Sequence, residues 1–282
     1  MRCVVLFARS SELATIIARA EELIASPSFS PRKDEARTRA GIVEVRGYGR
    51  VFIKRSASRS WISGFIERFK GSRASRAVKG SRMLEAGDIL HPKILAAMEI
   101  RRYGSVHASF VISEALGNAD TMSRFVLGPK GGRRHEVHRR KNISKAIAQS
   151  IRAMHEAGIY TRDLQETNLM IEELDGGFRV YFIDLEDFAR ARRVSLKRRL
   201  LNLVHLDRSI GRFVGRAGRL RFLYAYLGDD PERANLRPLV ARLLRMRARL
   251  DRRAAARAGR ETSASAKGST VSSGWRSALG GP

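Results

Sequence analysis

The chain has 282 residues, 43% of them hydrophobic, so it can bury a large core in one domain or in two lobes that share a cleft. It carries 55 Lys or Arg against 28 Asp or Glu, and this net charge of +27 indicates either a polyanionic partner or simply a basic solvated face. A single cysteine excludes an intrachain disulfide, and no apolar run is long enough for a signal peptide or for the roughly 20 residues of a membrane span, so we expect a cytoplasmic protein.

The first 116 residues are predicted to be rich in strands, because apolar and β-branched residues gather in short runs bounded by glycine or polar residues. The expected elements, in chain order, are a helix over 11–26, a loop over 27–40, a hairpin around Gly47 and Gly49, a helix over 72–86 that Gly80 weakens, and strands within 91–102 and 105–116.

The remaining chain is predicted to be mainly helical. After a polar, basic connection, a helical period places apolar residues on one face, and Gly158 ends that helix. These apolar residues are Ile143, Ala146, Ile147, Ile151 and Met154. The later elements are strands over 168–173 and 178–184 joined by a turn at 175–177, and basic helices up to about 227 and over 232–258.

We therefore expect an α+β fold with two lobes. The predicted division is an N-terminal helical extension (1–40), a strand-rich lobe (41–116), a linker and mainly helical lobe with basic helices (117–258), and a tail (259–282). The tail is rich in Ser, Gly and Ala and has little to bury, so we expect it to be disordered.

Residues 155–187 contain a spacing that is typical of phosphoryl transfer. Asn168 follows Asp163 by five residues, and Asp184 ends the second strand of the predicted hairpin. Such sites use one carboxylate to orient or deprotonate the attacking hydroxyl, and an amide with a second carboxylate to hold Mg²⁺. The pattern predicts Asp163 as catalytic and Asn168 and Asp184 as magnesium ligands, although a polar loop between strands would read similarly.

Features earlier in the chain support a nucleotide site. Lys54 ends the apolar strand RVFIKR, where a lysine either fixes nucleotide phosphates or reaches solvent. Gly47 and Gly49 precede it and are expected to cover the phosphates, unless they form only a turn. FVISEAL precedes a polar linker and predicts a hinge at which Glu114 and the backbone up to Leu116 face an adenine. Because these features follow the order that a two-lobed kinase requires, we favour a phosphotransferase.

The chain resembles the bacterial lipopolysaccharide kinases, the heptose/Kdo kinase family of kinase-like proteins, over about residues 41–228. The resemblance is carried by RVFIKR, LEAGDILHPKILAAME, FVISEAL, MHEAGIYTRDLQETNLMI, VYFIDLEDFARARR, SLKRRLLNLVHLDRSI and RLRFLYAYL. It implies a protein-kinase-like fold with a strand-rich N-lobe and a mainly helical C-lobe. It also implies that ATP and Mg²⁺ are used to phosphorylate a sugar hydroxyl of the lipopolysaccharide inner core, at the cytoplasmic face of the inner membrane.

Position by position, the resemblance assigns the catalytic aspartate to Asp163, the metal ligands to Asn168 and Asp184, and the nucleotide lysine to Lys54. One departure is Thr161, which stands where the family usually has a histidine before the Arg-Asp pair.

The second departure is a missing acid in the helix after Lys54, where kinases place the glutamate that pairs with the lysine. Glu85 and Glu67 are the nearest candidates, and Glu186 is expected to be a solvated acid. Either Lys54 is held differently, or Glu85 substitutes, or activity is weak. The missing acid and Thr161 together also leave open a pseudokinase, a binding module that keeps the fold and lacks turnover.

The expected partners are a lipopolysaccharide core acceptor and an anionic membrane surface. Basic residues after Asp184 are expected on the acceptor side, where they would bind sugar phosphates and carboxylates: Arg190, Arg192, Arg193, Lys197, Arg198 and Arg199. The helix predicted over 232–258 suits either lipid or packing on the C-lobe. We expect no specific nucleic acid, because zinc-finger and RNP motifs are missing. The oligomeric state stays open, as does a small-molecule or protein hydroxyl as acceptor.

Overall fold

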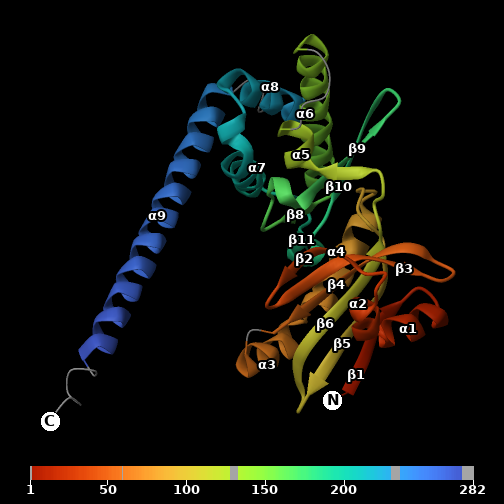
Figure 1. The fold of residues 1–282 in the computed structure, drawn as a ribbon. Coiled ribbons are helices and arrows are strands. Elements are labelled where there is room, and N and C mark those ends of the chain that lie inside the picture. The colour runs from red at the N-terminus through yellow and green to blue at the C-terminus, as the bar shows by residue number, and fades with distance from the viewer. Residues whose placement is uncertain (1, 59, 128–132, 230–235, 275–282) are drawn as a thin grey trace. The chain divides into compact units, whose positions relative to one another are not determined.

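The computed structural model describes residues 2–58, 60–127, 133–229 and 236–274. Residues up to Gly228 form one compact unit and those from Asp229 form a second. The first unit begins with a six-stranded antiparallel sheet in the order β1-β5-β6-β4-β3-β2 (Figure 1). Its strands are β1 (Arg2–Ala8), β2 (Ser30–Glu35), β3 (Thr38–Val45), β4 (Gly49–Ala57), β5 (Ile94–Arg102) and β6 (Ser105–Glu114).

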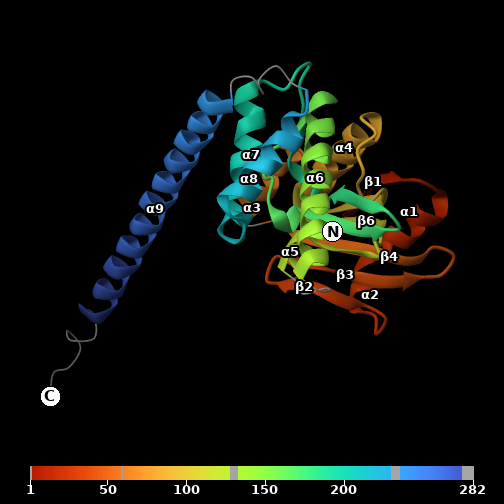
Figure 2. The same cartoon turned by 90° about the horizontal axis from the view of Figure 1, so that it is seen from above.

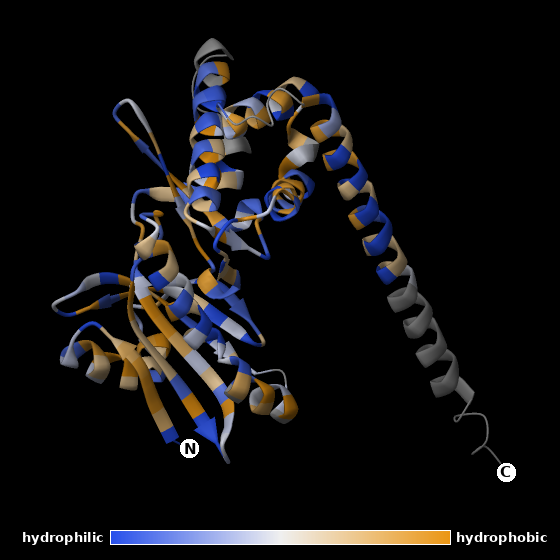
Figure 3. Cartoon of the chain, turned by 180° about the vertical axis from the view of Figure 1, so that it is seen from behind, coloured by the Kyte–Doolittle hydropathy of each residue, from blue (hydrophilic) through white to orange (hydrophobic). Residues whose placement is uncertain are grey.

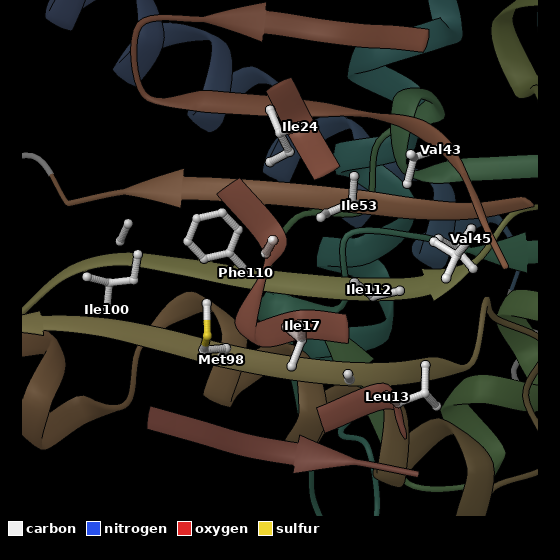
Figure 4. Close-up of a cluster of buried hydrophobic side chains, with 14 residues drawn as sticks. Leu13, Ile17, Ile24, Val43, Val45, Ile53, Met98, Ile100, Phe110 and Ile112 are labelled. Atoms are coloured by element: carbon white, nitrogen blue, oxygen red, sulfur yellow. The ribbon is translucent and has the colours of Figure 1, made fainter. Parts of the chain in front are cut away.

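Two short helices, α1 (Ser11–Ala18) and α2 (Ala20–Ala25), cover one face of this sheet. Figure 4 shows Leu13 and Ile17 of the first helix against sheet residues such as Phe110. Ile53 of β4 also belongs to this core. Because side chains alternate along a strand, the next residue, Lys54, points to the opposite face of the sheet.

Two further helices follow β4. They are α3 (Trp61–Lys70), capped by Ser60, and α4 (Arg73–Ala86), capped by Ser72. In both caps the serine hydroxyl accepts a hydrogen bond from a backbone N–H of the first turn, which satisfies a donor that the helix leaves unpaired. Helix α4 packs against β5 and against a short 3-10 helix, η2 (Leu185–Asp187).

The rest of the first unit is mainly helical. Its helices are α5 (Met122–Leu127), α6 (Arg133–Glu156), α7 (Leu196–Ile210) and α8 (Arg216–Leu227), with short helices η1 (Glu166–Asn168) and η3 (Gly211–Phe213). Its small sheets join β7 (Ala119–Thr121), β9 (Leu169–Leu174) and β10 (Gly177–Phe182), and β8 (Ile159–Thr161) with β11 (Phe188–Arg190). In Figures 1 and 2, α8 lies alongside α6.

The central helix α6 confirms the predicted apolar face. Of its five predicted members, Ile143, Ile147, Ile151 and Met154 are fully buried, whereas Ala146 is only half-buried. The helix gives way at Gly158, whose φ of +77° suits a residue without a side chain.

The second unit contains α9 (Leu236–Gly274). Over the residues that the structure describes, neither this helix nor any other combines the length and apolar character needed to cross a bilayer.

The structure differs from the sequence prediction at both ends of the chain. Residues 2–8, expected to lie in a helical extension, form β1 and extend the sheet along β5. The expected loop over 27–40 contains β2, a polar edge strand whose residues are all exposed, so it lacks the alternation that predicts strands. The tail expected from 259 continues α9 as far as Gly274, and residues 275–282 lie outside the described residues.

Candidate active site

Lys54 lies at the centre of a cluster of charged side chains from distant parts of the chain. Its Nζ donates hydrogen bonds to Oδ1 of Asp184 at 2.7 Å and to Oε1 of Glu186 at 2.9 Å. The structure therefore places the predicted nucleotide lysine in direct contact with the predicted metal aspartate, which is 130 residues away in the sequence.

The ionisation of Lys54 follows from these contacts. Burial by itself lowers the pKa of the Lys54 ammonium, because it removes the charged form from water. The charges of Glu186 and Asp184 and their hydrogen bonds outweigh burial, so the pKa lies above its ordinary value. Lys54 is therefore a fixed cation at neutral pH, as suits a side chain that binds phosphate oxygens.

Glu186 supplies the carboxylate that is missing from the helix after Lys54. Its side chain is only 12% exposed, so the expectation of a solvated acid is wrong. The two candidates named from the sequence have other partners. Glu85 pairs with Arg9, and Glu67 accepts a hydrogen bond from a serine hydroxyl. Lys54 is thus held differently from the usual kinase lysine, by an acid that follows Asp184.

Helix α4 presents cations to this acid. Arg73 Nε and Arg76 Nη2 each lie 3.8 Å from Glu186 Oε2. Protein kinases place the acid on this helix, so the ion pair here is inverted. Gly80 lets the helix backbone approach closely, because a Cβ added there would lie 2.1 Å from the carbonyl oxygen of Leu185. Close packing as well as charge therefore holds α4 against η2.

The loop around Asp163 is fixed by its own side chains. The backbone N–H of Asp163 donates to Oγ1 of Thr161 at 3.2 Å, and Nδ2 of Asn168 donates to the carbonyl oxygen of Asp163 at 2.9 Å. Gln165 Nε2 donates to Oδ1 of Asp163. Thr161 therefore braces the loop in place of the family's histidine, and Oδ2 of Asp163 is the oxygen best placed to meet a hydroxyl.

A buried polar network supports this loop from behind. Asn202 Nδ2 donates to the carbonyl oxygen of Thr161 at 2.6 Å, and Asn202 Oδ1 lies 3.0 Å from Nε2 of His155. Nδ1 of His155 lies 2.8 Å from the hydroxyl of Tyr226. Burial above all lowers the pKa of His155 to about 4, although the hydrogen bond to Asn202 opposes it. His155 is therefore neutral at pH 7 and positions the loop rather than reacting.

The backbones that carry the two predicted magnesium ligands, Asn168 and Asp184, lie side by side. The backbone N–H of Ile183 donates to the carbonyl oxygen of Asn168 at 2.9 Å, which brings the two predicted ligands together. Since the amide nitrogen of Asn168 holds the loop, its Oδ1 is the atom left to face a cation. Asp184 has a left-handed backbone (φ 59°, ψ 63°), a strain that is kept mainly at functional positions.

The donor set suits magnesium. In phosphoryl-transfer sites Mg²⁺ takes one or two protein oxygens and completes its shell with phosphates and water. The amide of Asn168 and the carboxylate of Asp184 provide such oxygens. In the described part of the chain, neither this site nor any other gathers three His, Cys, Asp or Glu side chains as metal ligands.

Gly47 and Gly49 do not lie beside Lys54. Both have positive φ, +83° and +66°, and form the turn between β3 and β4. Lys54 pairs with Ala40 near the start of β3, five residues or about 16 Å along β4 from Gly49. The turn on that side of the sheet is residues 35–38, between β2 and β3. The strand order therefore separates the two glycines from the expected phosphate position, and we do not retain them in the proposed site.

The predicted hinge lies at the end of β6. Glu114 pairs in register with Val51, three residues before Lys54 on the neighbouring strand. Its carboxylate accepts a hydrogen bond from the backbone N–H of Lys93 at 3.1 Å, so its side chain secures the strand end. Leu116 follows and is half-buried. A base-binding role for the backbone of these residues stays a prediction.

Residues of α7 that the sequence did not single out lie near Asp163. His205 is close enough for the charge of Asp163 to act on it, Arg208 acts on the same imidazole, and the exposed Arg162 directly precedes Asp163. Arg190 pairs with Ile159 of β8, and the acceptor-side role of the six basic residues after Asp184 stays a prediction. Burial above all lowers the pKa of His205 and Arg208 adds to this, although the charge of Asp163 opposes both. The arrangement places a His205 imidazole near the charges of Asp163 and Arg208, with the backbone of Arg162 as a hydrogen-bond partner.

Sequence reasoning missed several of these residues. Glu186 lies two residues after Asp184, and a partner acid could have been sought there once the helix lacked one. Gln165 lies two residues after Asp163, within the same motif. Asn202 and His205 carry no local signal, because only the packing of α7 brings them to the loop.

Comparisons with known proteins identify the family and the fold. A sequence model of the Lipopolysaccharide kinase (Kdo/WaaP) family matches residues 45–226. A solved structure described as WaaP in complex with acyl carrier protein is similar, with a TM-score of 0.62 and 20% identity, over 89% of this chain and 99% of that one. A search of curated proteins returned no match.

The structural similarity shows the fold, which is protein-kinase-like, with the six-stranded sheet in the N-lobe and the helices α5 to α8 in the C-lobe. The sequence match spans more than half of the chain, from the β3–β4 turn to the end of α8. The chain therefore belongs to the lipopolysaccharide kinase (Kdo/WaaP) family of phosphotransferases that act on sugar hydroxyls.

Proposed function

We propose that this protein transfers the γ-phosphoryl group of ATP to a sugar hydroxyl of the lipopolysaccharide inner core, with Mg²⁺, at the cytoplasmic face of the membrane. The observation that carries the proposal is the contact of Lys54 with Asp184 and Glu186, next to the loop that holds Asp163 and Asn168. Magnesium, when bound, would neutralise charge on the phosphates. Asn168 and Asp184 would hold it.

Lys54 would bind phosphate oxygens while Glu186 keeps it in place. In the absence of nucleotide, Lys54 divides its hydrogen bonds between two carboxylates. Exchange of the Asp184 contact for phosphate oxygens leaves the Glu186 contact intact. The inverted ion pair thus allows Asp184 to turn to the cation without releasing the lysine.

Asp163 would orient the acceptor. The sugar hydroxyl oxygen forms a bond to the γ-phosphorus, the bond to the β,γ-bridging oxygen breaks, and ADP leaves. Oδ2 of Asp163 takes the hydroxyl proton, while Gln165 holds Oδ1. Arg162, next to Asp163 in the chain, and Arg208, near His205, would bind phosphates or carboxylates of the core sugars.

The structure weakens the pseudokinase alternative. That alternative arose from the missing helix acid and from Thr161 in place of histidine. Glu186 provides a buried carboxylate for Lys54, and Thr161 makes the hydrogen bond that braces the loop. Both functions are therefore performed by other residues.

Transfer of labelled phosphate from ATP to purified lipopolysaccharide core tests the proposal. Asp163→Asn should lower kcat by at least about a hundredfold, because it removes the proton acceptor, while ATP binding stays unchanged. Asp184→Asn should abolish the magnesium dependence of ATP binding. Asp175→Asn is the matched control, since it makes the same change in the exposed turn between β9 and β10. Normal turnover by Asp163→Asn would refute the assignment of the catalytic loop.

The similar structure also makes an acyl carrier protein a candidate partner of this chain. Co-elution of the purified full chain with acylated carrier protein in gel filtration would support that partner, and separate elution would remove it.

A further inference from the structure

Helix α3 turns its apolar residues outward. Ile62 is 65% exposed, Phe65 44%, Ile66 45% and Phe69 74%. Their spacing of three, four and seven residues places them in one stripe along the helix. The rings of Phe65 and Phe69 also contact each other edge to face, with centroids 5.3 Å apart.

The face of α3 that packs on the sheet is small and polar. A Cβ added at Gly64 would lie 2.2 Å from the carbonyl oxygen of Val106 in β6. Glu67 accepts a hydrogen bond from the hydroxyl of Ser58 at 2.9 Å. The amphipathic pattern is thus the reverse of that in a helix that packs by its apolar face. Because the stripe contributes little to folding, its exposure indicates a binding surface.

The β5–β6 turn precedes the part of β6 on which α3 packs, because Gly64 approaches Val106, two residues after the turn. In Figures 1 and 3, α3 lies toward that end of the sheet. Tyr103 in this turn is 86% exposed and has a φ of +49°, which is unusual for an aromatic residue. The guanidinium of Arg102 lies 5.4 Å from the centre of the Tyr103 ring. A strained turn therefore displays a tyrosine and an arginine just before the part of β6 on which α3 packs. We call Ile62, Phe65, Ile66, Phe69, Arg102 and Tyr103 the α3 face.

The charge around the α3 face is positive. Lys70 ends the helix and is exposed, as is Arg102. The nearby acids are not exposed to a partner, because Glu67 faces the sheet and Glu99 is 3% exposed and paired with Arg101. Arg73 and Arg76 of the next helix face Glu186 instead, so the described cations at this rim are Lys70 and Arg102. The rim therefore complements an anionic surface.

We propose that the α3 face docks on an anionic lipid surface. The apolar stripe enters the boundary between headgroups and acyl chains, and Tyr103, Lys70 and Arg102 lie at headgroup level. A single convex helix suits lipid, which adapts its shape to a ridge, whereas an acidic protein would need a complementary groove. The proposal is independent of catalysis, although it would bring the N-lobe to the membrane that carries the proposed acceptor.

Vesicle co-sedimentation of the full chain tests this directly. Binding of the wild type and of the double variant Ile62→Ser/Phe69→Ser is measured on two kinds of vesicle. One is anionic, made of phosphatidylglycerol and phosphatidylethanolamine, and the other is pure phosphatidylcholine. Ile62 and Phe69 are the most exposed of the stripe, so the variant should keep its melting temperature. The matched control is Leu244→Ser, which changes an exposed leucine of α9, the other candidate for lipid binding.

We expect wild type and Leu244→Ser to bind the anionic vesicles, with binding weakened by salt, and Ile62→Ser/Phe69→Ser to bind at least tenfold less. Transfer to a delipidated core oligosaccharide should be unchanged in all three, which separates docking from catalysis. The proposal fails if the wild type does not bind anionic vesicles, or if Leu244→Ser loses binding while the double variant keeps it.

Fluorescence of the two tryptophans provides a second measurement of docking. Trp275→Phe leaves Trp61, in α3, as the only reporter, and Trp61→Phe leaves Trp275. On anionic vesicles the emission of Trp61 should shift to the blue and be quenched by brominated lipid. A shift of Trp275 alone would overturn the proposal. The proposal would also be overturned if Ile62 and Phe69 were needed for a different contact. Such a contact would be a dimer of the wild type that forms without lipid, or a complex with an acyl carrier protein.

Discussion

At the residue scale, the site depends on where one carboxylate is placed. Glu186 follows Asp184 by two residues, yet it meets Lys54 from β4 and two arginines from α4. Kinases that carry the acid on the helix can separate lysine and acid by moving that helix. Here the acid belongs to the segment that carries Asp184. The lysine is therefore held as long as that segment is in place.

Glu186→Gln should weaken binding of Mg²⁺-ATP by about tenfold, equivalent to about 1.4 kcal/mol, because it removes the charge that holds Lys54. Isothermal titration calorimetry, with Mg²⁺-ATP added to the purified protein, measures this affinity. Glu22→Gln is the matched control, since Glu22 is exposed on α2, where it pairs with Arg19 of the same surface. A double-mutant cycle with Lys54→Met should be non-additive, and an additive cycle would show that Glu186 does not act through Lys54.

At the element scale, α4 and η2 behave as one packed pair. Gly80 reads in the sequence as a residue that weakens a helix, whereas the structure uses it to bring the helix backbone against Leu185. The same contact fixes η2, and η2 carries Glu186 directly after Asp184. Packing of this helix is therefore connected to the geometry of the predicted metal aspartate.

Gly80→Ala should destabilise the protein by about 1–3 kcal/mol, because the added methyl forces α4 away from η2. This loss should appear although alanine favours a helix by about 1 kcal/mol over glycine. Urea denaturation measures the free energy of unfolding, and the KM for ATP should rise as well. Gly259→Ala in α9 is the matched control, since a Cβ there would meet no atom within 4 Å. Equal stability of wild type and Gly80→Ala would contradict the close approach.

At the scale of the whole molecule, a buried network ties α6, α7 and α8 to the loop that carries Asp163. His155, Asn202 and Tyr226 come from these three helices and meet in a core without water-facing surface. Since His155 is buried without charge, unfolding exposes a group that gains a proton in mild acid. The stability of the first unit should therefore depend on pH.

The pKa of His155 is lowered from 6.5 to about 4, so the folded state binds fewer protons than the unfolded state between these values. Stability should be complete above pH 6.5 and should fall by roughly 3 kcal/mol as the pH drops to 4. Urea denaturation across this range measures the slope. His155→Gln should flatten the slope although it lowers stability at pH 7, whereas His107→Gln, at an exposed position of β6, should leave it unchanged. An unaltered slope in His155→Gln would refute the assignment.

The sequence by itself determined the residues that depend on local spacing and periodicity. Three features are each encoded within a short stretch of the sequence: the five-residue spacing of Asp163 and Asn168, the hairpin before Asp184, and the apolar face of α6. Such patterns report which residues share a loop or a face, and the family resemblance rested on them. The two-lobed kinase fold followed from their order.

The tertiary structure decided which residues meet across the sequence. The sequence does not distinguish Glu186 from other acids, and only the packing of β4 and η2 brings it to Lys54. In the same way, only the packing of α7 behind the loop brings Asn202 to Thr161. The glycines of the β3–β4 turn were misplaced for the same reason, because strand order rather than distance along the chain sets the end of the sheet on which a turn lies. Local pattern is a property of neighbours in the chain, whereas an ion pair or a register requires long-range packing that no short stretch encodes.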